Sequence, residues 1–184
     1  MQRGYHRGVV ALVVMLLAAG CTAAEPEVTT PPDDADVYGG FAIDPPAPDD
    51  VVLTLEGTTT VDVTIAELEA LATTDVRFRE PFVGVDQTFT VVPLAELLER
   101  AGIGAGDEVD TIALNDYRYR DAVDALIAAD ALLAVARDGA PIPMNAGGPI
   151  RLVFDTDSDY HGFLDAWNWS LRRIALVDPV PSDS

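Results

Sequence analysis

The sequence predicts an α+β domain over residues 51–178, a mixed β-sheet with short helices interspersed between its strands. Short apolar or alternating runs, typical of strands, recur along this region. Helix-start signals followed by leucines at helical spacing lie between several of these runs. Turn residues separate the elements and no internal repeat is visible, so the pattern indicates a sheet-centred domain.

The first predicted elements are a hairpin and a helix. Val51–Leu55 and Val61–Val63 flank the turn-rich residues 57–60, which indicates two antiparallel strands. Thr64 and Glu67 form the two ends of a capping box, so a helix is expected to begin there. Its apolar positions, three or four residues apart, are Ile65, Leu68 and Leu71.

A second pair of strands and a second helix follow. Val76–Glu80 and Gln87–Val92 have strand-like patterns. Pro93 fits the first helical position, N1, because its missing N–H would be unpaired there in any case. Gly102 is expected to end this helix. The apolar positions of the helix are Leu94, Leu97 and Leu98.

The C-terminal part continues the alternation of strands with turns. Asp121–Ala129 is expected to be a short helix, and Asp138-Gly139 is a tight-turn signal. The predicted strands of this part are Thr111–Leu114, Leu132–Arg137, Ile150–Phe154 and Leu171–Val177.

Composition excludes several function classes. All 11 basic side chains are arginine, so lysine nucleophiles and lysine Schiff bases are absent. The one cysteine of the chain cannot form an internal disulfide, a CxxC pair or a thiolate zinc cluster. A formal charge of −20 argues against nucleic-acid partners, which need a basic surface.

Residues 1–20 have the features of a secretory signal peptide. Arg3 and Arg7 precede an apolar run, Val9–Ala19, that is too short to span a bilayer. Ala18-Ala19-Gly20 then leads directly into Cys21, which resembles the lipobox of bacterial lipoproteins. We therefore expect Cys21 to be acylated and to anchor an extracytoplasmic protein in the cell membrane; the alternative is simple cleavage with Cys21 incidental.

Residues 21–50 are predicted to be the lipidated cysteine and a tether. Residues 22–50 hold six prolines, eight acids and no basic residue, which favours extended conformations. Tyr38, Gly39, Gly40, Phe41 and Ile43 interrupt this composition and are candidates to pack on the domain. After removal of residues 1–20 the charge is 9 − 31 = −22, so lipid and not electrostatics must hold the chain at an anionic membrane. Residues 179–184 are taken as a tail.

The motifs from residue 92 onward occur in a specific order. They are V-P-L-A-E-L-L at 92–98, N-D-Y at 115–117, D-G-A-P-I-P at 138–143, G-G-P-I-R-L-V at 147–153, tryptophans at 167 and 169, and R-I-A-L at 173–176. Together they resemble the molybdopterin-binding domain of sulfite-oxidase-type oxidoreductases over residues 51–178. The resemblance implies that family's fold and a pterin-bound molybdenum.

The resemblance also implies a cysteine thiolate on molybdenum, after the strand that precedes V-P-L. The corresponding residues 77–84 read R-F-R-E-P-F-V-G and contain no sulfur, and oxygen donors suit harder cations. Asn145-Ala146 stand where the family commonly has a histidine before G-G-P, and the family's lysine is missing. Exported members resemble twin-arginine cargo, which crosses folded, whereas Arg3 and Arg7 are not adjacent. We expect the fold without the usual chemistry.

Arginines supply one candidate binding site. Arg77 and Arg79 alternate on one predicted strand, as do Arg118 and Arg120, so each pair shares a face and could hold an anion through planar hydrogen bonds. The resemblance places Arg151 near the cofactor. The candidate anion- or cofactor-binding residues are Arg77, Arg79, Tyr117, Arg118, Arg120, Asn145, Gly147, Gly148 and Arg151. The alternative is that the arginines form surface ion pairs with the many acids.

A second candidate site is the acidic segment that starts at Asp155. Asp155, Asp157 and Asp159 alternate like the first ligands of a calcium loop, although the glycine and glutamate of an EF-hand are replaced by Tyr160 and Ala166. The interpretations left open are a non-EF calcium site and a solvated acidic loop.

His161, Ser158 and two tryptophans are weaker candidates. His161 could join carboxylates on zinc, but a lone histidine is usually structural. Ser158 and His161 lie too close in one loop to suggest a hydrolytic triad. Trp167 and Trp169 would line a pocket or divide between core and surface.

The sequence thus predicts a binding or accessory module without canonical molybdenum catalysis, and leaves open whether it is an enzyme. Its partners are expected to be the membrane, through the lipid, and a protein or small anionic ligand that the residues do not identify. The two competing hypotheses are an oxidoreductase that binds a pterin cofactor without the thiolate, and a calcium-dependent adhesion or assembly module.

Overall fold

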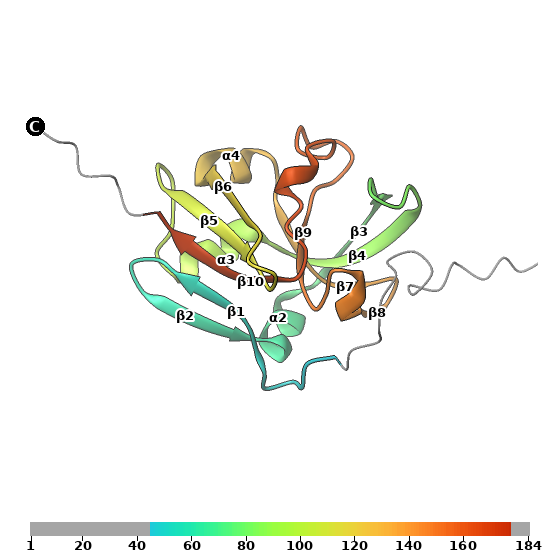
Figure 1. Ribbon diagram of the computed structural model, residues 1–184, viewed down its shortest axis with the longest axis horizontal. Coiled ribbons are helices and arrows are strands. Elements are labelled where there is room, and N and C mark those ends of the chain that lie inside the picture. Colours follow the sequence, from blue (N-terminus) through green and yellow to red (C-terminus); the bar gives the residue numbers. More distant parts are fainter. Residues whose placement is uncertain (1–44, 178–184) are drawn as a thin grey trace, which may run out of the picture. The chain divides into compact units, whose positions relative to one another are not determined.

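Two five-stranded sheets carry the fold in the computed structural model, which describes residues 45–177 (Figure 1). Sheet A has the order β2 (Thr60–Thr64), β1 (Val51–Glu56), β10 (Leu171–Leu176), β5 (Glu108–Ala113) and β6 (Arg118–Ala122). Its neighbours are antiparallel except for the parallel pair β1 and β10. The parallel pair joins strands from opposite ends of the domain.

Sheet B is antiparallel throughout. Its order is β3 (Thr74–Arg79), β4 (Asp86–Pro93), β7 (Leu132–Arg137) and β8 (Ala140–Pro141), and β9 (Arg151–Val153) also pairs with β7. The helices of the described residues are α2 (Ile65–Leu71), α3 (Leu94–Arg100) and α4 (Val123–Ala128), with the 3-10 turns η1 (Met144–Ala146) and η2 (Leu164–Ala166).

The two faces of sheet A differ in polarity. Leu53, Leu55, Val63 and Ile174 are buried on one face and belong to the hydrophobic core. The opposite face carries cross-strand polar pairs, such as the hydrogen bond from Thr54 to Asp62 at 2.7 Å. Successive side chains of a strand point to opposite faces of the sheet, so a sheet with one face on the core and one in water alternates apolar and polar residues.

Local sequence signals fixed most elements. The capping box of α2 is present: the Thr64 hydroxyl accepts the N–H of Glu67, whose carboxylate accepts the N–H of Thr64. The N–H and the hydroxyl of Thr64 both donate to the Glu67 carboxylate, and these two bonds hold the pKa of Glu67 below its usual range. Gly102, at φ 69°, follows the end of α3, and the Asp138-Gly139 turn links β7 to β8 with both φ angles positive. The predicted α+β class is confirmed.

Several boundaries differ from the sequence prediction; strand β5, for example, starts at Glu108 and not at Thr111. Pro93 is the N-cap of α3 and not N1, because its extended backbone (ψ 128°) completes β4. The segment Arg118–Ala122 is strand β6, which was not predicted, so α4 starts at Val123 instead of Asp121.

In the described residues, no helix is long and apolar enough to cross a membrane.

The predicted signal peptide, Cys21 and most of the tether lie outside the described residues, as does the tail. The expected lipidation at Cys21 therefore stays a prediction.

Candidate functional site

A buried ion pair occupies the segment in which the resemblance expects a metal ligand. Glu80 directly follows β3, and Arg151 begins β9, 71 residues later. The Arg151 Nη2 donates to Glu80 Oε1 at 3.0 Å, and both side chains are 0% exposed. Two charges removed from water in this way are tolerated only with good geometry and further hydrogen bonds.

The second oxygen of Glu80 organises the loop between β3 and β4. Glu80 Oε2 accepts the backbone N–H of Phe82 at 3.0 Å and that of Val83 at 2.8 Å. The backbone of Glu80 also bonds to Val85 and Gly84. Both carboxylate oxygens are thus used inside the protein.

Aromatic rings enclose the guanidinium of Arg151. Its Cζ lies 4.9 Å from the ring centroid of Phe89 and 4.8 Å from that of Trp169. Trp169 also packs on Phe82 of the loop, at 4.7 Å between centroids. The cation therefore lies among rings, a favourable site when it is desolvated.

Gly147 and Gly148 serve close packing at this site. A Cβ on Gly147 would lie 2.9 Å from the Trp169 ring, and one on Gly148 would lie 2.0 Å from the carbonyl oxygen of Ile142. The N–H of Gly148 donates to the Pro143 carbonyl at 2.9 Å, so this candidate donor is already bonded. Asn145 lies half-buried in η1 beside these glycines.

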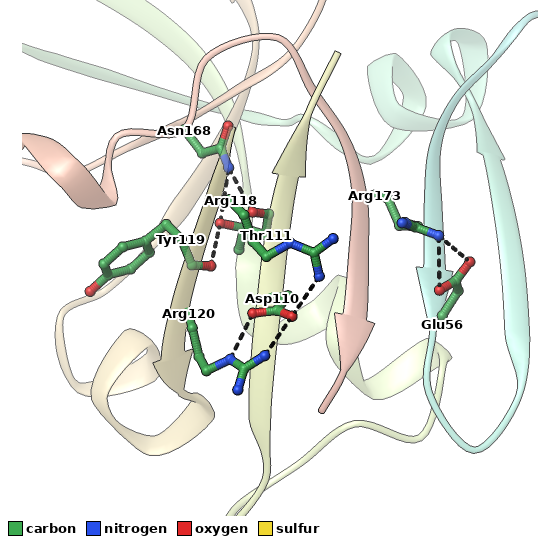
Figure 2. Close-up of polar contacts among 8 residues, drawn as sticks. All are labelled: Glu56, Asp110, Thr111, Arg118, Tyr119, Arg120, Asn168 and Arg173. Atoms are coloured by element: carbon green, nitrogen blue, oxygen red, sulfur yellow. Dashed lines mark hydrogen bonds and ion pairs between the residues drawn. The ribbon is translucent and has the colours of Figure 1, made fainter. Parts of the chain in front are cut away.

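Arg118 and Arg120 share a face, as the alternation predicted. The anionic group that they bind is the carboxylate of Asp110, on the neighbouring strand (Figure 2). Asp110 Oδ1 accepts from Arg120 Nε at 2.8 Å, and Asp110 Oδ2 accepts from Arg120 Nη2 at 2.9 Å and from Arg118 Nη1 at 2.8 Å. The Arg120 hydrogen bonds, helped by Arg118, hold the pKa of Asp110 below its usual range. Asp110 thus takes the place that a bound anion would need.

The remaining candidates do not converge with these residues. Arg77 lies on β3 in sheet B and approaches Asp86 at 3.5 Å on the surface, and Arg79 is exposed. Tyr117 donates its hydroxyl to the Asp165 carbonyl at 2.9 Å, and burial, with the nearby Asp165 charge, raises its pKa. The candidate arginines therefore do not form one group, because the two pairs lie on different sheets and Arg151 lies in the core.

The acidic loop is held by bonds that leave its aspartates apart. In the described residues, no group of three His, Cys, Asp or Glu side chains is placed to hold a metal ion, so Asp155, Asp157 and Asp159 do not converge. His161 Nδ1 lies 3.0 Å from the Phe154 carbonyl oxygen, and the Ser158 hydroxyl donates to the Ala129 carbonyl at 2.7 Å. These contacts give both residues a structural role.

The tryptophans divide as one interpretation expected. Trp167 is 3% exposed and lies in the core, whereas Trp169 is partly buried beside Arg151.

Sequence reasoning missed a polar cluster at the edge strand β6 of sheet A. Tyr119 and Tyr160 both donate to Asp121 Oδ2. The Asp121 hydrogen bond and burial raise the pKa of Tyr160, and burial, with the Asp121 bond, raises that of Tyr119. The phenols stay protonated, so they are hydrogen-bond donors and not bases.

A groove of about 550 Å³ opens on the surface of sheet A. It lies at the N-terminal ends of β1 and β10, lined among others by Val51, Leu114, Met144 and Arg172.

These residues do not fit a pterin-bound molybdenum. A thiolate is missing from the described residues, since Cys21 is the only cysteine of the chain. Glu80 and Arg151 bond to each other, Gly148 donates to Pro143, and Arg118 and Arg120 hold Asp110. These residues are thus already bonded within the protein.

Comparison with known proteins identifies the fold independently. A family model described as the oxidoreductase molybdopterin binding domain matches residues 45–161. None of the curated proteins matches the chain.

Proposed function

Because the chain belongs to the family of oxidoreductase molybdopterin-binding domains, we propose that it is a lipid-anchored, extracytoplasmic binding or accessory domain that has lost molybdenum catalysis. In this proposal the family's fold serves as a scaffold for binding a protein or a small ligand. Fold and function separate readily, since function depends on particular site residues.

The observation that carries the proposal is the pair Glu80–Arg151. Where the family resemblance expects a soft thiolate ligand, the chain has a hard carboxylate that is fully buried and bonded to a guanidinium at 3.0 Å. Arg151 is further packed against two aromatic rings. A metal in this place would have to displace the buried guanidinium of Arg151 and separate it from the carboxylate of Glu80. Breaking a buried ion pair in this way is costly.

The anchor follows from the N-terminal sequence. A short apolar run and three small residues precede Cys21, and the body of the protein is too acidic to bind an anionic membrane by charge. A diacylglycerol on Cys21 supplies the attachment that the charge does not.

Labelling of cells with a fatty-acid analogue tests the anchor. The wild-type chain should take up label and fractionate with membranes, and Cys21→Ser should do neither. Equal labelling of the two chains, or a wild-type chain in the soluble fraction, would contradict the anchor.

Pterin analysis tests the loss of the cofactor. The chain is produced in a host that makes molybdopterin, purified, and oxidised, and the released pterin is measured by fluorescence. We expect background fluorescence. Stoichiometric pterin would overturn the proposal in favour of a cofactor-binding oxidoreductase.

A further inference from the structure

The groove at the start of sheet A is partly open, and its lining is mixed, with Asp50, Thr54 and Arg172 beside apolar side chains. β1 and β10 pair from Thr54 and Arg173 onward, so the residues upstream of this pairing form the groove wall together with η1 and the end of β5. Its apolar lining includes Val51, Leu53, Leu114, Met144 and Leu171. Val51 is 53% exposed and Leu114 is 49% exposed, so both offer apolar surface at the groove.

The chain itself enters the domain at this groove. Pro46, the second of the described residues, is part of the wall. The turn that follows is fixed, because Asp50 accepts the N–H of Ala47 through its side chain at 2.8 Å and donates its own N–H to the Ala47 carbonyl at 2.9 Å. The segment just upstream of Pro46 must therefore start beside the groove.

The segment upstream of Pro46 carries large apolar side chains of the kind that would fill the groove. Between Gly39 and Asp50, Phe41 and Ile43 are the only large apolar side chains apart from prolines. On an extended chain they point to the same side, since they are two residues apart, and Ala42 points to the other side. Asp44 precedes a proline, which itself favours an extended backbone.

Reach and concentration favour this occupant over a separate molecule. Ile43 lies three residues from Pro46 and Phe41 lies five, which limits them to about 11 Å and about 18 Å from it on a fully extended chain. So short a link gives an effective concentration on the order of millimolar, enough to fill a groove of weak intrinsic affinity.

We infer that residues 39–44 dock in this groove, with Phe41 and Ile43 as the side chains that fill it. The docked segment covers Val51 and Leu114 and fixes where the tether leaves the domain. The free spacer between Cys21 and the domain is then shorter than the composition alone suggests.

Hydrogen exchange on the full chain after signal-peptide removal tests this docking. Amides of residues 39–44 should exchange at least about tenfold more slowly than in a free peptide of the same sequence. Phe41→Asp should abolish the slowing. Ala42→Asp is the matched control, because it adds the same charge one residue away on the side that faces out, and it should keep the slowing.

A variant of the groove wall completes the test. Leu114→Asp should release the segment without altering it, while circular dichroism shows an unchanged fold; Leu114 is exposed enough to tolerate the charge. Exchange at the free-peptide rate in the wild-type chain would overturn the inference. Equal slowing in Phe41→Asp would do so as well. Slowing that grows with protein concentration would assign the groove to a second copy instead.

Discussion

Replacing Glu80 by glutamine should destabilise the domain far more than its small change in volume suggests. Glutamine can still accept the N–H groups of Phe82 and Val83, but it removes the negative charge that Glu80 places against the Arg151 guanidinium among apolar rings. Both partners are 0% exposed, so the loss belongs to the class of broken buried pairs, about 3–5 kcal/mol. The matched control, Arg77→Gln, breaks an exposed pair and should cost less than about 1 kcal/mol.

Urea unfolding followed by tryptophan fluorescence measures these values. Trp169 lies 4.8 Å from the Arg151 guanidinium, so its fluorescence reports on this region directly. A double variant, Glu80→Leu with Arg151→Met, removes both charges together. The double variant should lose less free energy of unfolding than Glu80→Leu and Arg151→Met lose in sum, because it removes both charges of the pair together.

Two results would refute the reasoning. A cost for Glu80→Gln as small as that for Arg77→Gln would mean that Arg151 does not depend on Glu80. Additive costs in the double variant would mean that the two side chains do not interact.

Three further predictions concern other parts of the domain. The pKa of Asp110 is lowered in the folded state, so its stabilisation is full above the ordinary carboxyl pKa and is lost as pH falls through the lowered value; the difference in free energy of unfolding between wild type and Asp110→Asn should therefore shrink below about pH 4. A constant difference down to acid unfolding would contradict this. Gly148→Ala should lower the melting temperature sharply, because its Cβ would meet a carbonyl at 2.0 Å, whereas Gly162→Ala meets nothing within 4 Å and should be neutral. Calcium should leave the melting temperature unchanged; a rise that Asp157→Ala abolishes would restore the calcium hypothesis.

Local patterns predicted the elements well because their causes lie within a few residues. The capping box at Thr64 and Glu67 and the turn at Asp138-Gly139 act within their own segments. Strand β6 escaped notice since R-Y-R-D-A is polar and lies at a sheet edge, where alternation with apolar residues is weak.

The contacts of the site residues were harder to predict from the sequence, because their partners are distant along the chain. The alternation of Arg118 and Arg120 correctly placed them on one face, but their partner Asp110 lies on the neighbouring strand. Glu80 and Arg151 are 71 residues apart, and Glu80 stands directly after Arg79 in the sequence, where no local pattern indicates a buried carboxylate. Such pairs follow from sheet topology, which periodicity does not determine.

The loss of molybdenum chemistry is tested most directly by elemental analysis of the protein purified from the membranes of its own host. The buried pair and the lack of a second cysteine predict molybdenum at background level per chain. One molybdenum per chain would contradict the account, because it would require Glu80 and Arg151 to be arranged differently in the cell.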